Sequence, residues 1–169
     1  MPYALLSFLW TSLVGVFLLV GSGLRLWQTA NPLQTHVIFA LSAVTLALFA
    51  HTMTMFYFIG TGKKIKDFMA EWEPEIRDEF RRRTIETKRK LFPWMLLSSG
   101  ALMAAFILGG AADARVVQKT IHVASAYFAL IAHVHGVGLE TIHIFRNISL
   151  IHEINDLARR RHISAAASS

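Results

Sequence analysis

Long stretches without any charged side chain constrain the fold of this 169-residue chain more than any other feature. Each stretch reaches or exceeds the roughly 20 residues that a helix needs to cross a bilayer. Hydrophobic residues make up 54% of the chain. Four membrane helices account for most of its length, which leaves no room for a second domain. The sequence therefore predicts an all-α integral membrane four-helix bundle, a single membrane domain over residues 1–169. The uncharged stretches are residues 1–24, 26–62, 91–112 and 120–139.

Local signals set the ends of the predicted helices. Asn31-Pro32 is typical of a helix start, with an N-cap followed by proline at the first helical position. Phe92-Pro93-Trp94 is typical of a start at the membrane interface. The first stretch lacks a basic leading segment and is long for a signal peptide, so it is expected to be retained as a helix. The predicted membrane helices span residues 4–28, 33–60, 91–112 and 116–145.

The basic residues predict the topology. Of the 17 Lys and Arg, ten lie in residues 63–90 and four follow residue 145. By the positive-inside rule, the 63–90 segment and both termini are expected to be cytoplasmic, with a bacterial plasma (inner) membrane as the expected location. Topology thus explains the net charge of +6 without a nucleic-acid partner. The charged 63–90 segment is expected to run as a helix along the membrane surface. The tail, 146–169, is expected to be polar and basic and frayed at its Ala/Ser end.

Histidine is the residue type in the uncharged stretches that points to chemistry. An ionisable side chain in hydrocarbon is costly and usually faces the bundle interior. His36 and His51 lie on the second predicted helix, and His122 and His133 lie on the fourth. Depths counted along the helices pair His36 with His122 and His51 with His133. His135 is a weaker alternative to His133, because it lies on another face of the helix.

Two pairs of imidazoles at matching depths predict metal binding. Because the chain has no cysteine, thiolate zinc sites, cysteine-bound iron–sulfur clusters and covalent c-type haem are excluded. Haem b needs two axial imidazoles and a flat apolar slot. One or two haem b groups are therefore expected between the second and fourth helices, with His36, His51, His122 and His133 as iron ligands.

This arrangement resembles the N-terminal four-helix bundle of di-haem cytochrome b from quinol–cytochrome c reductases. The resemblance covers residues 4–145 and implies haem between the second and fourth helices. It also implies ring-facing glycines on the first and third helices, at Gly15 and Gly100. The ligand spacings here are 15 and 11 residues, whereas the two pairs of the family share one spacing.

Glu140 is the one acid within a predicted membrane helix, on the stripe of the fourth helix that carries His122 and His133. One interpretation is a proton acceptor for a quinol, since burial favours the neutral acid. The alternative is a surface acid paired with Arg146 or Lys63.

Other metal sites and a cofactor-free role stay open. Glu140 and His143 form an E-x-x-H pattern, which di-iron bundles use together with further carboxylates. His51, Met53 and Met55, opposite His133, could bind copper. A non-catalytic structural or assembly subunit would use the buried histidines as helix-bridging hydrogen-bonding groups. His143, His152 and His162 are expected to be solvated at or beyond the cytoplasmic surface.

The leading functional hypothesis is an electron-transfer subunit or anchor of a larger oxidoreductase. It would pass electrons across or within the bilayer, with a quinone as one candidate partner. The 63–90 segment is the expected docking surface for a redox protein, with outer-face docking left open. A complex or homo-oligomer is expected, because a chain this small has no catalytic domain of its own.

Overall fold

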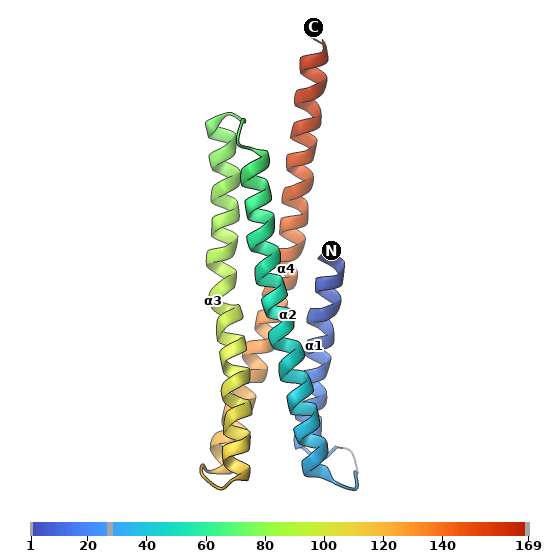
Figure 1. Ribbon diagram of the computed structural model, residues 1–169, viewed down its shortest axis with the longest axis vertical. Coiled ribbons are helices and arrows are strands. Elements are labelled where there is room, and N and C mark those ends of the chain that lie inside the picture. Colours follow the sequence, from blue (N-terminus) through green and yellow to red (C-terminus); the bar gives the residue numbers. More distant parts are fainter. Residues whose placement is uncertain (1, 27–28, 168–169) are drawn as a thin grey trace.

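The computed structural model describes residues 2–26 and 29–167, and the all-α four-helix prediction is confirmed. The chain runs up and down the bundle axis four times (Figure 1). Each helix is long and apolar enough to cross a membrane. The helices are α1 (Pro2–Gly23), α2 (Pro32–Phe68), α3 (Pro74–Asp113) and α4 (Lys119–Ala167).

The helix ends follow from local chemistry. The Asn31 side chain accepts a hydrogen bond from the backbone N–H of Gln34, and Pro32 occupies the first turn of α2. Arg25 and Arg115, after α1 and α3, have φ values of 56° and 60°. Each thus occupies the left-handed position that closes a helix C-terminus, more often filled by glycine.

The helices are arranged so that α2 and α4 lie diagonally across the bundle. The extensive contacts join α1 to α2, α2 to α3, α3 to α4 and α1 to α4. Large apolar side chains cover the outside of the bundle, as expected for lipid-facing helices. Small side chains let the helices approach closely near the middle, where the buried core includes Ala43, Ala47, Ala101, Ala105, Ala129 and Ala132.

Two ends of the bundle differ in structure. The connection end carries the α1–α2 and α3–α4 connections, and α2 and α3 diverge toward it (Figure 1). At the opposite end, α2, α3 and α4 extend well past the first residues of α1. We call this extension the stalk; its buried core consists of Ile65, Met69, Phe80, Leu150 and Ile154.

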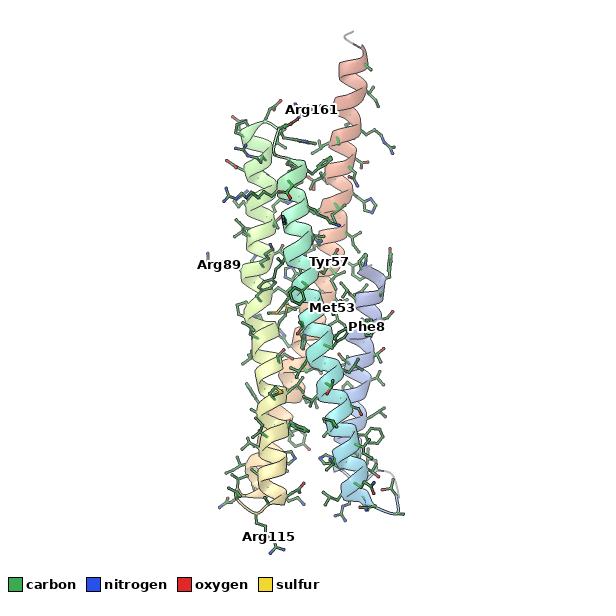
Figure 2. All side chains as sticks on the ribbon, viewed as in Figure 1. Phe8, Met53, Tyr57, Arg89, Arg115 and Arg161 are labelled. Atoms are coloured by element: carbon green, nitrogen blue, oxygen red, sulfur yellow. The ribbon has the colours of Figure 1, made fainter. Side chains whose placement is uncertain are left out.

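The stalk corrects two expectations. The 63–90 segment does not bend away from the bundle as a surface helix would, because α2 and α3 continue straight along the bundle axis and turn at residues 69–73. The fourth helix does not end at residue 145, since α4 continues to Ala167 and includes most of the 146–169 tail. Near its end, the Arg161 guanidinium lies 5.6 Å from the Trp72 ring centroid, which ties α4 to the α2–α3 turn (Figure 2).

Candidate functional site

The bundle interior brings the four predicted histidines together in the expected pairs. His36 and His122 face each other near the connection end, with ring centroids 6.4 Å apart and ring planes at 76°. His51 and His133 meet near the middle of the bundle, with ring centroids 5.1 Å apart. In both pairs one ring comes from α2 and the other from α4, across the bundle diagonal.

The outer pair is held through one nitrogen of each ring. The Nδ1 atom of His36 lies 2.9 Å from the Ser22 hydroxyl oxygen, and Nδ1 of His122 lies 3.2 Å from the Ala105 carbonyl oxygen. Because Ser22 donates its proton to the Leu19 carbonyl, its oxygen accepts from His36. Within residues 2–26 and 29–167, neither Nε2 atom has a hydrogen-bond partner. Metal-bound histidines are commonly held in this way, with Nδ1–H donated to a fixed acceptor and Nε2 left for the metal.

A cavity of about 450 Å³ contains this pair. Small-molecule and cofactor sites span roughly 300–1,000 Å³. The walls are mostly aliphatic and aromatic side chains from all four helices, and the charged residues among its lining are Arg25, Asp113 and Lys119. Two imidazoles in an apolar chamber with cations at its rim match what haem b requires.

The ring separation of the outer pair fits ligation of one metal ion. Because metal–nitrogen bonds are about 2 Å long, nitrogens on opposite sides of one metal lie about 4 Å apart, and their ring centroids about 6 Å. The observed 6.4 Å agrees with this separation. His36 and His122 are therefore the residues that would hold the iron of a haem in this cavity.

The inner pair belongs to a different kind of site. His51 Nε2 lies 3.1 Å from His133 Nδ1 and 2.9 Å from the Ser98 hydroxyl oxygen. His51 Nδ1 shares a hydrogen bond with Glu140 Oε1, and His133 Nε2 lies 3.4 Å from the Ser12 hydroxyl oxygen. These five side chains, each at most 1% exposed, form the mid-bundle cluster: Ser12, His51, Ser98, His133 and Glu140.

The mid-bundle cluster does not fit a second haem. Facing nitrogens of His51 and His133 are only 3.1 Å apart, whereas iron between them requires about 4 Å. The remaining nitrogens of both rings are engaged by Glu140 and Ser12. Of the one or two haem groups expected, the side chains therefore fit one, between His36 and His122.

His135 lies on the outer surface of the bundle. It is exposed, and its ring packs 4.4 Å from that of Trp94, centroid to centroid. His133, two residues earlier, is completely buried. Of these two histidines, His133 thus faces the interior.

The two glycines implied by the family resemblance are not at the cavity. Gly15 packs against Ala43 of α2, and Gly100 is exposed with open space beside it. Rotation of α1 and α3 about their axes instead turns Gly23 and Gly109 toward the outer histidines. A Cβ at Gly109 would lie 3.0 Å from Cε1 of His122, and one at Gly23 would lie 3.2 Å from Cε1 of His36.

Two expected surface residues are buried instead. Glu140 is completely buried and bonded to His51, so it is not paired with Arg146 or Lys63. His143 is 6% exposed, because it lies one turn after Glu140 on the face of α4 that points into the bundle. His152 is exposed as expected. Of the described atoms, Glu140 Oε2 and His143 Nδ1 are buried without hydrogen-bond partners. The His162 side chain lies outside the described residues.

The alternative metal sites find no support. Among the described residues, no three His, Cys, Asp or Glu side chains are grouped to hold a metal ion. Met53 and Met55 pack against the apolar core instead of joining His51 and His133 (Figure 2 labels Met53). Glu140 and His143 have no further carboxylate beside them in the described interior, as a di-iron site would require.

The serines of the site were not predicted from the sequence. Ser12, Ser22 and Ser98 each contact a buried histidine. Serine is common in membrane helices as a packing residue, so its presence alone gives no signal. No protein-family model, curated protein or solved structure matches this chain.

Proposed function

We propose that this chain is a membrane protein that binds one haem b at the connection end and serves as an electron-transfer subunit. The observation that carries the proposal is the pair His36 and His122, whose rings lie 6.4 Å apart in an apolar cavity. Their Nδ1 atoms are tied to Ser22 and Ala105, which leaves both Nε2 atoms for iron.

When bound, haem b supplies a one-electron Fe(III)/Fe(II) couple. The protein's part is to hold and enclose this group. Ser22 and Ala105 fix the tautomer and orientation of the two ligands, since each accepts a hydrogen bond from Nδ1–H. The apolar walls would pack against the macrocycle, and Arg25 and Lys119, which line the cavity together with Asp113, would supply positive charge for the propionate groups.

A partner protein at the stalk is part of this proposal. The groove between α2 and α3 in the stalk is lined by basic and apolar side chains, with no acidic one among its described lining residues. Acidic surfaces of a redox partner would complement it. The Lys88 amino group lies beside Gly62, where α2 has no side chain. The basic lining residues are Lys63, Lys66, Arg77, Arg81 and Lys88.

One observation favours a second candidate, a structural or assembly subunit without a cofactor. The mid-bundle cluster joins all four helices, through Ser12 of α1, His51 of α2, Ser98 of α3 and His133 with Glu140 of α4. Hydrogen bonds of this kind hold membrane helices together without further chemistry. The same cluster is compatible with the haem proposal, because it lies on the stalk side of the cavity and none of its residues lines the cavity.

Haem content separates the two candidates. The full chain is expressed with a haem supply, purified in mild detergent and assayed by pyridine haemochrome and by a reduced-minus-oxidised spectrum. We expect b-type bands and one haem per chain. His36→Ala and His122→Ala should each abolish the bands, whereas His135→Ala, on the exposed face of α4, should keep them. A folded but colourless protein would reject the haem proposal and leave the structural subunit.

A further inference from the structure

Hydrogen-bond donors and acceptors can be assigned within the mid-bundle cluster. Ser12 donates its hydroxyl proton to the Leu9 carbonyl at 2.7 Å, so its oxygen is free to accept from His133 Nε2–H. His133 Nδ1 must then accept, because a neutral imidazole has one donor and one acceptor nitrogen. The available donors to it are His51 Nε2–H and the Ser98 hydroxyl, at 3.1 Å and 3.3 Å.

This chain of assignments leaves one mobile proton. His51 Nε2 donates toward His133 or Ser98, so the mobile proton lies between His51 Nδ1 and Glu140 Oε1. Either a protonated Glu140 donates to neutral His51, or an imidazolium at His51 donates Nδ1–H to the carboxylate. The two forms contain the same number of protons. They differ by breaking one N–H bond and forming one O–H bond.

The stalk-end side of this pair carries unused polar atoms. Glu140 Oε2 is buried without a partner, and one turn further along α4 the Nδ1 atom of His143 is also buried without one. One turn beyond, the Asn147 amide donates to the Tyr57 hydroxyl at 3.0 Å. Figure 2 places Tyr57 on α2 toward the stalk from Met53. Buried polar groups left unpaired are costly, and a water near Glu140 Oε2 and His143 Nδ1 would satisfy them.

The opposite side of the cluster is closed. About one helical turn of apolar side chains separates it from the connection-end cavity, through Val16, Val44, Leu102 and Ala129. These residues are buried and pack together in one cluster. The buried polar atoms beyond the His51–Glu140 pair thus lie on its stalk side, whereas the side toward the cavity is apolar.

We propose that His51 and Glu140 form an exchangeable proton-holding site, loaded from the stalk end past His143 and Asn147. The ligand is a proton delivered by water. On loading, a hydronium gives its proton to the carboxylate oxygen Oε2 and leaves as water, so that the pair gains one positive charge. On unloading, the reverse step returns the proton to water at the same end. This inference goes beyond the proposed haem and does not depend on it.

The groups that face the pair are few. Apart from His51, the titratable side chains in the cluster or on its stalk side are His133 and His143 of α4, with Tyr57 of α2 further along. The facing residues of α1 and α3 are the neutral Ser12 and Ser98. Arg146 and Lys90 act electrostatically on His143 from the stalk side. No other acid lies in the described part of this interior, so Glu140 alone can give a buried carboxyl signal.

The test is infrared spectroscopy of the full chain in lipid bilayers, with and without bound haem, as the perfusing buffer is stepped between about pH 5 and pH 9. We expect a pH-dependent carboxyl C=O band that shifts in heavy water. Glu140→Gln should remove it, and Glu86→Gln, on the exposed face of the stalk, should leave it. Glu140→Asp, which keeps the carboxyl group, should keep a band at a changed frequency and covers the case in which the glutamine variant does not fold.

The loading route has its own readout. His143→Leu should slow the appearance of the band after a pH step about tenfold, since it removes the buried, unpaired polar atom one turn from Glu140 on the stalk side. Ile142→Leu, on the exposed face of α4, is the matched control. Absence of a pH-dependent carboxyl band from the wild type would overturn the proton-holding site. An unchanged rate in His143→Leu would overturn the route. Neither result depends on haem content, so the haem proposal is tested separately.

Discussion

His51 and Glu140, 89 residues apart in the chain, share a hydrogen bond in the middle of the bundle, where neither is more than 1% exposed. The bond joins α2 to α4 across the bundle diagonal, beside the His51–His133 contact between the same two helices. It also fixes which nitrogen of His51 faces His133 and Ser98. The pair therefore organises the polar interior of the protein.

Breaking this pair from one side should destabilise the bundle. Glu140→Leu leaves Nδ1 of His51 unpaired in a buried position, which costs about 3 kcal/mol. Side-chain hydrogen bonds in membrane proteins average about 0.6 kcal/mol. Because both partners of this pair are completely buried, we expect a larger coupling, about 1–2 kcal/mol, in a double-mutant cycle with His51→Leu. Unfolding in detergent, followed by circular dichroism, measures it. Additive effects of the two changes would show that the bond contributes nothing beyond packing.

A methyl group at Gly109 should disturb the outer site without touching its ligands. The added Cβ would lie 3.0 Å from Cε1 of His122, so the ring must move away from its position. Changes that misorient a metal-bound histidine weaken metal binding by about 10–100-fold, and Gly109→Ala should weaken haem binding by about tenfold. Haem titration of the purified protein measures this. Gly100→Ala, whose added Cβ meets nothing, is the control, and equal haem binding in both variants would contradict the placement of the site.

The membrane part of the fold follows from the sequence, and the stalk does not. Uncharged stretches mark where helices cross lipid, and Asn31-Pro32 begins α2 where expected. The 63–90 segment was expected to be helical, but its direction along the bundle axis and the continuation of α4 beyond residue 145 were not predicted. The signal was present in the spacing of four between Ile65 and Met69 and between Leu150 and Ile154, which puts both members of each pair on one helix face.

The depth of a residue in the bundle was easier to predict than its direction. A constant rise per residue paired His36 with His122 and His51 with His133, as observed. The rotation of each helix depends on packing against its neighbours, which no single sequence reveals. Gly15 and Gly100 were therefore misplaced. For Glu140, the stripe that it shares with His133 correctly indicated the interior, although a surface pairing had been the competing interpretation.

Packing and charge should contribute very differently to the stalk. Phe80 is 3% exposed in the stalk core, so Phe80→Ala should cost about 3–5 kcal/mol and open this region locally. Arg83 donates to Glu153 at 3.0 Å between α3 and α4, but both side chains are exposed. Glu153→Gln should therefore cost less than about 1 kcal/mol, and high salt should remove even that difference.

Limited trypsin digestion compares these two variants, because the stalk is rich in Lys and Arg. Phe80→Ala should be cut much faster than the wild type in residues 77–90, and Glu153→Gln at nearly the wild-type rate. Rapid cleavage of Glu153→Gln would mean that the ion pair and not the apolar core holds α4 against α3.

The topology predicted from the basic residues can be tested by cysteine labelling, because the chain has no cysteine of its own. Ala70 lies exposed in the α2–α3 turn at the tip of the stalk, and Gln118 lies exposed in the α3–α4 connection. With the basic stalk in the cytoplasm, Gln118→Cys should react with an impermeant maleimide added to whole cells, whereas Ala70→Cys should react only after lysis. The cavity with His36 and His122 would then face the outside, and the stalk end, from which the proton site is loaded, would face the cytoplasm. The reverse labelling pattern would invert both assignments.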